Sequence, residues 1–193
     1  WATHGEPNAR NAHPHLGMTG NVVVVHNGIV ENFLELRQEL SAEGAVFNSD
    51  TDTEVIVHLV ERYLCSGTPD TTENGLAGAT RQALQHLKGA HGIVLISSLE
   101  PDKIVAARIG NAGGVVIGLG EGEAFVASDL PAILEYTRRV VFLESRQMAV
   151  ITRDGLQVQS LEGRAVDYEV HHISWDPVSA EKGVYHHFME KEI

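Results

Sequence analysis

The sequence has 193 residues, of which 43% are hydrophobic and 21% charged, and its formal net charge at pH 7 is −12. These values are typical of a globular domain with one sizeable core, and the negative charge argues against binding to nucleic-acid phosphates. No run approaches the roughly 18 apolar residues of a spanning helix, and the single cysteine excludes an intrachain disulfide and suits a reducing cytoplasm. We therefore expect neither nucleic acid nor a membrane as a partner.

The first half of the chain predicts one strand and three helices. A helical period ends at Gly44, and Thr51 to Glu54 has the pattern of a capping box ahead of a further helix. The apolar run that precedes Asn27 predicts a strand buried on both faces. The expected elements are a loop over 1–20, a strand over 21–26, and helices over 32–43, from the capping box to 63, and over 76–87.

From His91 onward, short apolar runs alternate with Gly, Pro and Asp, as in antiparallel sheets. Asp154-Gly155 predicts a two-residue hairpin turn. The glycine-rich stretch 118–122 also indicates a hairpin, because it lacks the Lys-Ser/Thr that follows a phosphate-binding loop. A strand, helices and then a long antiparallel meander favour an α+β fold. The expected strands are 92–97, 103–109, 114–118, 124–128, 140–143, 148–152 and 156–160.

Asn27 and Gly28 directly follow the first predicted strand. An Asn side-chain amide beside a Gly backbone N–H offers two donors in fixed positions. Donors arranged around a developing oxyanion contribute about 3 kcal/mol each to catalysis, and glycine permits a positive φ and close approach of a ligand. The alternative is that Asn-Gly only forms a turn after the strand.

A second group of polar residues suits a zwitterionic amino-acid ligand. Thr3 and His4 offer donors to a carboxylate, and Asp52 offers an acceptor to an ammonium group. Asp52 also stands at the predicted start of a helix, where an acid caps free N–H groups and interacts with the helix dipole. Capping alone is therefore the alternative explanation for Asp52.

The histidines suggest a third possibility, a metal site. His4, His13, His15 and His26 lie close together in sequence, and His13-Pro14-His15 resembles the spacing of metal ligands. No carboxylate or cysteine accompanies them in a specific ligand pattern, so we expect no metal. A histidine-based metallohydrolase is kept as an alternative hypothesis.

Cys65 is the one thiol of the sequence. It falls at the predicted C-terminal end of the second helix, where the dipole disfavours a thiolate, and no base is adjacent in sequence. We interpret Cys65 as a structural residue and not as a nucleophile.

Several stretches together resemble the glutaminase domain of the glutamine–fructose-6-phosphate aminotransferase (glucosamine-6-phosphate synthase) family. They are WATHGEPNARNAHPH, VVVVHNGIVENFLELRQEL, SDTDTEVIVHLV and KGVYHHFMEKEI, with weaker matches at DKIVAAR, VVIGLG and AFVASD. The resemblance covers nearly the whole chain. It implies an N-terminal-nucleophile hydrolase fold, a four-layer αββα sandwich of two antiparallel sheets between helices.

The resemblance also implies roles for the candidate residues. In that family a cysteine at the mature amino terminus attacks glutamine, and its α-amine is the general base. The resemblance implies that no organic cofactor is needed either. Asn27 and Gly28 are then expected to form the oxyanion hole. Thr3 and His4 are expected to bind the glutamine α-carboxylate, and Asp52 the α-ammonium group.

Some parts of the family pattern are expected outside this sequence. The resemblance places a cysteine-bearing segment, the first strand of the sandwich and an arginine before Trp1, which itself would belong to a mobile loop that closes over glutamine. The chain is therefore expected to be an incomplete domain, inactive alone. Residues 1–181 would form the amidotransferase domain, and 182–193 would begin a linker to a sugar-isomerase domain that binds fructose 6-phosphate and forms a homodimer.

The predicted function is the hydrolysis of glutamine to supply ammonia for the conversion of fructose 6-phosphate to glucosamine 6-phosphate in the cytoplasm. Besides the metallohydrolase, one further alternative is a module that binds glutamine or a partner protein and catalyses nothing. An intact-mass measurement of the natural gene product would separate the enzyme from the binding module, and metal analysis would test the metallohydrolase.

Overall fold

The computed structural model describes residues 4–66 and 75–174. Trp1, Thr3 and the predicted boundary between residues 181 and 182 lie outside the described residues. Of the helices that the structure describes, none has both the length and the apolar character needed to cross a bilayer.

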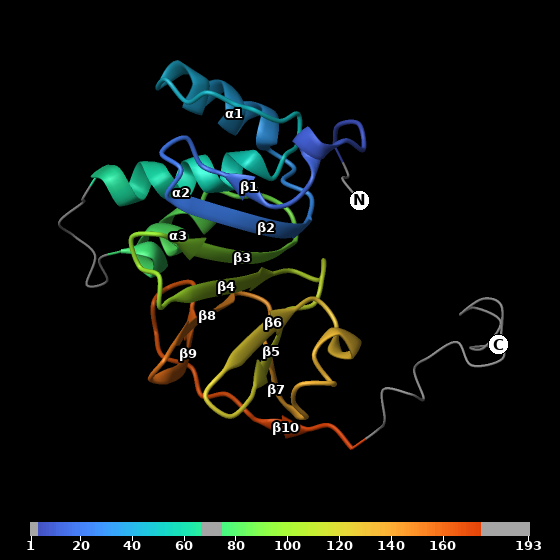
Figure 1. Cartoon of the computed structure of the whole chain (residues 1–193). Helices are drawn as coiled ribbons and strands as arrows, with labels where there is room; N and C mark the ends of the chain where they lie inside the picture. Colours follow the sequence, from blue (N-terminus) through green and yellow to red (C-terminus); the bar gives the residue numbers. More distant parts are fainter. Residues whose placement is uncertain (1–3, 67–74, 175–193) are drawn as a thin grey trace, which may run out of the picture.

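The described part of the chain contains helices, short 3-10 turns and two sheets (Figure 1). The helices and turns are η1 (Ala9–Asn11), α1 (Phe33–Ala42), α2 (Glu54–Ser66), α3 (Leu76–Leu84) and η2 (Leu130–Ala132). The strands are β1 (His15–Leu16), β2 (Val22–Gly28), β3 (His91–Ser97), β4 (Ile104–Ile109), β5 (Val116–Leu119), β6 (Ala124–Ala127), β7 (Arg139–Phe142), β8 (Gln147–Thr152), β9 (Gly155–Ser160) and β10 (His171–His172).

The strands form two antiparallel sheets. The six-stranded sheet has the order β1-β2-β3-β4-β8-β9, and the four-stranded sheet has the order β10-β7-β5-β6. The predicted continuous meander is therefore wrong, because the chain leaves the first sheet after β4 and returns to it at β8. The sequence could not reveal which strands belong to which sheet, because the strands of both sheets are similar short apolar runs.

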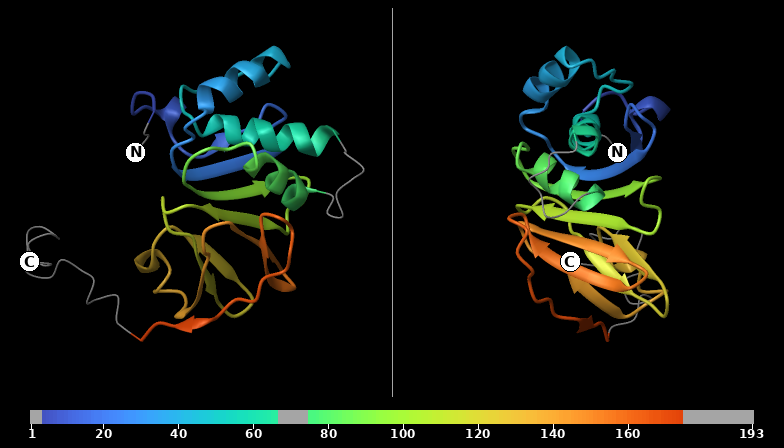
Figure 2. Two further views of the ribbon diagram at one scale, coloured as in Figure 1. Left: turned by 180° about the vertical axis from the view of Figure 1, so that it is seen from behind. Right: turned by 90° about the vertical axis from the view of Figure 1, so that its left-hand side faces the viewer.

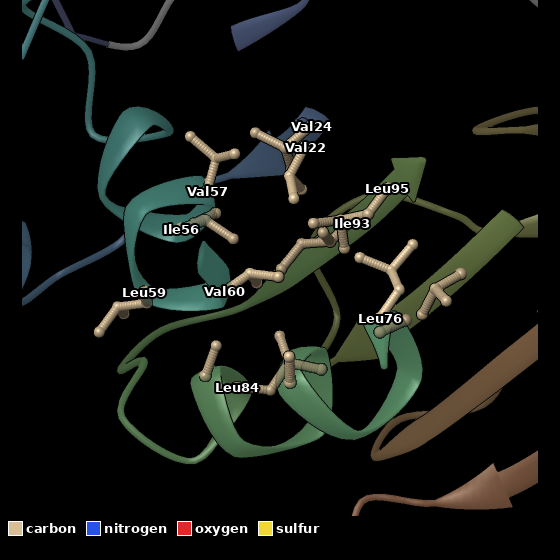
Figure 3. Close-up of a cluster of buried hydrophobic side chains, with 14 of the residues drawn as sticks. Val22, Val24, Ile56, Val57, Leu59, Val60, Leu76, Leu84, Ile93 and Leu95 are labelled. Atoms are coloured by element: carbon tan, nitrogen blue, oxygen red, sulfur yellow. The ribbon is translucent and has the colours of Figure 1, made fainter. Parts of the chain in front are cut away.

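The three helices cover one face of the six-stranded sheet (Figures 1 and 2). Helix α2 packs on β2, α3 lies beside α2, and α1 lies outside α2. Val55, Ile56, Leu59 and Val60 are fully buried on α2, as its helical period predicts. They meet side chains of the sheet such as Val24 in the core drawn in Figure 3. This core holds the N-terminal end of α2 firmly against β2.

A second core lies between the two sheets. Ala106 of β4 and Ile151 of β8 pack there against Ile117 of β5 and Val141 of β7. On the other face of the four-stranded sheet, η2 and the residues after it bury Ile133 against the strands. The predicted α+β fold with two packed antiparallel sheets is confirmed.

Strand β2 differs from its prediction in one respect that matters for the site. Val22, Val24 and His26 are buried toward the helices, whereas Val25 is 39% exposed and Asn27 is exposed. The prediction that both faces are buried is wrong, because the apolar core between the sheets is built over β4, β8 and β9. The side of β2 that carries Asn27 is consequently accessible.

The remaining differences are local. The predicted loop over 1–20 contains η1 and the two-residue strand β1, and the third helix ends at Leu84 and not at residue 87. The predicted β8–β9 hairpin is confirmed, but Thr152 pairs with Gly155, so its two turn residues are Arg153 and Asp154. The β5–β6 hairpin around 118–122 is also confirmed.

Candidate active site

The C-terminal end of β2 carries the Asn27-Gly28 pair. Because side chains alternate along a strand, His26 points into the helical core while Asn27 points to the opposite, accessible face. Within the described part of the chain, no hydrogen bond engages the Asn27 carboxamide. Gly28 has a φ of 136°, and a Cβ at this position would lie 2.1 Å from the Ala90 carbonyl oxygen. The backbone geometry at the end of β2 therefore requires glycine.

His26 links this strand to the loop before α2. Its Nδ1 lies 3.0 Å from Thr53 Oγ1, and its Nε2 lies 3.1 Å from His91 Nδ1 on the neighbouring strand. Burial, reinforced by the nearby His91, lowers the pKa of His26 to about 3. His26 is therefore neutral at pH 7, and so weak a base is not suited to accept a proton from a nucleophile near neutral pH.

Asp52 lies beside the segment that follows β2. The residue is 2% exposed, and its Oδ2 accepts a hydrogen bond of 2.7 Å from the Val30 backbone N–H. Its other oxygen, Oδ1, lies 3.6 Å from His4 Nδ1. The fold thus brings together three predicted site elements that are far apart in sequence, namely His4, the end of β2 and Asp52.

His4 lies between Asp52 and Phe33 and contacts both. Its side chain is 31% exposed, and its ring packs against Phe33 with the two centroids 4.7 Å apart.

Burial lowers the pKa of both His15 and His91, so these rings are also neutral at pH 7. They place no positive charge near Asp52 that would compete with a cationic ligand.

Glu54 organises the loop that carries Asp52. One carboxylate oxygen accepts the Asn48 N–H at 2.7 Å, and the other accepts the Ser49 N–H at 2.7 Å and the Ser49 hydroxyl at 2.6 Å. The predicted capping box is therefore wrong, because it pairs the Glu54 carboxylate with Thr51, whereas in the structure the carboxylate accepts hydrogen bonds from Ser49 and Asn48. Thr51 Oγ1 instead contacts Ser49 Oγ and His15 Nε2.

The pKa of the Glu54 carboxyl reflects this network. Burial alone would raise it, but His58 on the next helical turn, the two backbone N–H groups and the Ser49 hydroxyl lower it to about 2. A carboxyl whose pKa is lower in the folded state stabilises the protein above its unfolded pKa. This contribution is lost as the pH falls from about 4.5 toward 2.

Replacing Glu54 by glutamine is expected to lower the free energy of unfolding at pH 7 by about 2–3 kcal/mol, because neutral hydrogen bonds replace charge-assisted ones. The difference from the unaltered protein should shrink as the pH falls from about 4.5 toward 2, because the Glu54 carboxyl is protonated in the unfolded chain at a higher pH than in the folded protein. Thermal unfolding between pH 7 and pH 3 measures this. Glu35→Gln, the same change on an exposed residue of α1, is the control. An equal difference at both pH values would contradict the assignment.

A hollow of about 210 Å³ lies against the accessible face of β2. Its lining includes Asn27, His13 and Val25, the facing Gly92 of β3, and Ser128 after β6. Of the candidate residues, Asn27 lines this hollow, whereas His4, Gly28 and Asp52 do not. A larger hollow of about 390 Å³, around the β8–β9 turn, lies at the other end of the six-stranded sheet.

The histidine cluster has no geometry of a metal site in the described residues. His15 contacts Thr51, and both ring nitrogens of His26 face Thr53 and His91. No group of three or more histidine, cysteine or acidic side chains among the described residues is arranged to hold a metal ion. The metallohydrolase hypothesis thus finds no ligand set in this part of the chain.

Cys65 lies far from the other candidate residues. It is exposed in the last turn of α2, eleven residues beyond Glu54, which corresponds to about 16 Å along the helix. Its exposure shows that the thiol is not part of the core, so the interpretation of Cys65 as structural is wrong. Its distance from Asp52 keeps it away from the candidate site.

Sequence reasoning missed several supporting residues of the site. Thr53 and His91 hold His26, and Asn11 contacts the Asp52 loop across 39 residues of sequence. Neither a period nor a spacing rule could find these contacts, because each depends on the tertiary fold. Among these supporting residues, only Glu54 could be recognised from the sequence, because it belongs to a capping-box pattern.

Comparisons with known proteins identify the family of this chain. Residues 6–135 match the family model described as a glutamine amidotransferase domain. The glutamine–fructose-6-phosphate aminotransferases (isomerizing) of Methanothermobacter thermautotrophicus and Chlorobaculum tepidum are each 50% identical over 193 residues. Those residues are 100% of this chain and, respectively, 31% and 30% of the two proteins. The chain therefore spans less than a third of the length of these curated relatives.

A solved structure with a similar fold is the glutamine phosphoribosylpyrophosphate amidotransferase of B. subtilis complexed with ADP and GMP. It aligns with a TM-score of 0.61 and 24% sequence identity, over 77% of this chain and 31% of that chain. At this level of identity the likeness concerns the fold.

Proposed function

This chain belongs to the glutamine amidotransferase domain family, and on that basis we propose that the end of β2 and the Asp52 loop form a glutamine-hydrolysing site. Asn27 and Gly28 donate hydrogen bonds to the oxyanion, and Asp52 accepts one from the α-ammonium group. His4 and Thr3 bind the α-carboxylate, and Trp1 closes over the substrate.

The observation that carries this proposal is the contact between Asp52 and the segment after β2. Val30 is two residues beyond Gly28, and its backbone N–H donates a hydrogen bond to the Asp52 carboxylate. This bond holds the carboxylate close to the end of β2. The acceptor for the ammonium group and the donors for the oxyanion are thus held on one rigid unit. Such preorganisation lets both ends of an amino acid be bound without reorganising the site.

The chemistry follows from these positions. A thiolate attacks the side-chain carbonyl carbon of glutamine, and the resulting oxyanion is stabilised by Asn27 and Gly28. The α-amine of the attacking cysteine, which took the thiol proton, passes it to the amide nitrogen, which then leaves as ammonia; water hydrolyses the thioester to glutamate and restores the thiol. As the family resemblance implies, the thiolate belongs to a cysteine outside this sequence, because Cys65 is remote from the site.

The substrates of the whole protein are proposed from its relatives, which are named as glutamine–fructose-6-phosphate aminotransferases. The ammonia would convert fructose 6-phosphate to glucosamine 6-phosphate on a separate sugar-isomerase domain that also forms a homodimer. In this arrangement residues 1–181 are the amidotransferase domain and residues 182–193 begin the linker.

The release of products tests the proposal. The protein that carries this chain, incubated with L-glutamine, is expected to release glutamate and ammonia in equal amounts, and glucosamine 6-phosphate when fructose 6-phosphate is added. Glutamine binding without glutamate release would favour the non-catalytic binding module. Neither binding nor release would overturn the proposal.

A further inference from the structure

Asn11 is a buried amide that joins the two loops of the candidate substrate site. It is 3% exposed in η1. Its Oδ1 accepts the Asp50 backbone N–H at 2.9 Å, and its Nδ2 donates to the Glu6 carbonyl oxygen at 3.0 Å. One side chain thus spans from the loop that contains His4 to the loop that contains Asp52.

The packing around Asn11 leaves little freedom. Gly5, directly after His4, has a φ of 82°, and a Cβ there would lie 2.5 Å from Asn11 Nδ2. The backbone N–H of Asn11 is also engaged, since it donates to Asn8 Oδ1 at 3.1 Å. The Asn11 side-chain amide therefore has one position between the two loops, and its two hydrogen bonds fix the distance between them.

A second connection between the same loops is exposed. Arg10 donates to the Asn48 carbonyl and pairs with Asp50 at 3.0 Å, but the Arg10 and Asp50 side chains are 57% and 55% exposed. Exposed ion pairs contribute little, whereas removing one partner of a buried hydrogen bond leaves the other unsatisfied. Asn11 is consequently the stronger of the two connections.

We propose that Asn11 is a positioning residue for glutamine, which sets the distance between the groups that bind its α-carboxylate and its α-ammonium group. The inference rests on the proposed function. The oxyanion donors on β2 are tied to the Asp52 loop by the contacts of His26 with Thr53 and of Val30 with Asp52, and neither contact involves Asn11. Loss of Asn11 therefore weakens substrate binding and leaves the chemical step nearly unchanged.

The test compares two ligands that the enzyme does not consume. L-glutamate carries both the carboxylate and the ammonium group, whereas glutarate lacks the ammonium group. In Asn11→Ala, the affinity for glutamate measured by titration calorimetry should fall about tenfold, and the affinity for glutarate should fall less than twofold. In steady-state assays, KM for glutamine should rise about tenfold while kcat changes less than twofold.

Two further variants make the comparison specific. Arg10→Ala removes the exposed connection, and it should change glutamate affinity less than twofold. Asn11→Ser keeps a polar group but is too short to span both loops, and it should reproduce the loss seen with alanine. It also provides the same readout if the alanine variant does not fold.

The outcomes separate a positioning role from general loosening. Equal losses for glutamate and glutarate, or a fall in kcat as large as the rise in KM, would overturn the inference. So would unchanged glutamate affinity in both Asn11 variants. If the unaltered protein binds neither ligand, the proposed function is overturned, and this inference falls with it.

Discussion

Replacing Asn27 by alanine is expected to lower the rate of glutamine hydrolysis by roughly 10²-fold, the cost of losing one oxyanion-hole donor. The side chain lies on the accessible face of β2 and makes no hydrogen bond to another described residue. Its removal should therefore change the thermal unfolding midpoint very little. KM for glutamine should also change little, because the lost interaction forms mainly in the transition state.

Asn21→Ala is the matched control for this prediction. Asn21 precedes the same strand, six residues from Asn27, or about 20 Å along an extended chain. The control should retain full activity. Unchanged turnover in Asn27→Ala, or an equal loss in both variants, would contradict the role of Asn27 in the oxyanion hole.

Asp52→Asn is expected to weaken glutamine binding by roughly 10- to 100-fold, the range for losing a charge-assisted hydrogen bond. The amide oxygen of the variant can still accept the Val30 N–H, so the fold should be preserved. Asp52→Ala loses this acceptor as well, and it should also lower the free energy of unfolding by about 1–3 kcal/mol. Calorimetric titration with L-glutamate and thermal unfolding measure the two effects.

Asp50→Asn provides the matched control, because it removes the same charge from an exposed residue of the same loop. Its affinity for glutamate should stay within twofold of that of the unaltered protein. If Asp52→Asn lost stability and kept its affinity, Asp52 would be only a structural acceptor for Val30 N–H. Asp52 would then have a structural role and no role in binding.

Much of the fold could be predicted from local patterns. The strands after His91 and the buried face of α2 follow from apolar periodicity, which depends on nearby residues alone. The exchange of strands between two sheets could not be predicted in this way, because pairing β4 with β8 joins segments separated by three strands of the second sheet, namely β5, β6 and β7. Two-residue strands such as β1 carry too few residues for any period.

In the candidate site, too, local sequence patterns predicted some features, whereas others depend on tertiary contacts. Asn27 and Gly28 could be recognised because the strand, the amide and the glycine are adjacent in sequence. The neutral state of His26 could not, since it results from burial beside Thr53 and His91. The sequence pattern grouped His26 with possible metal ligands, and only the tertiary contacts showed it to be a hydrogen-bonded core residue.

The most direct test follows individual amides by ¹⁵N–¹H nuclear magnetic resonance while L-glutamate is added to the protein. The γ-carboxylate of glutamate would occupy the oxyanion hole, and its ammonium group would contact Asp52. We predict that the Asn27 side-chain NH₂, the Gly28 N–H and the Val30 N–H shift together with one dissociation constant. Shifts confined to the hollow around Ile104 and Thr152, or no shifts at all, would contradict a glutamine site at the end of β2.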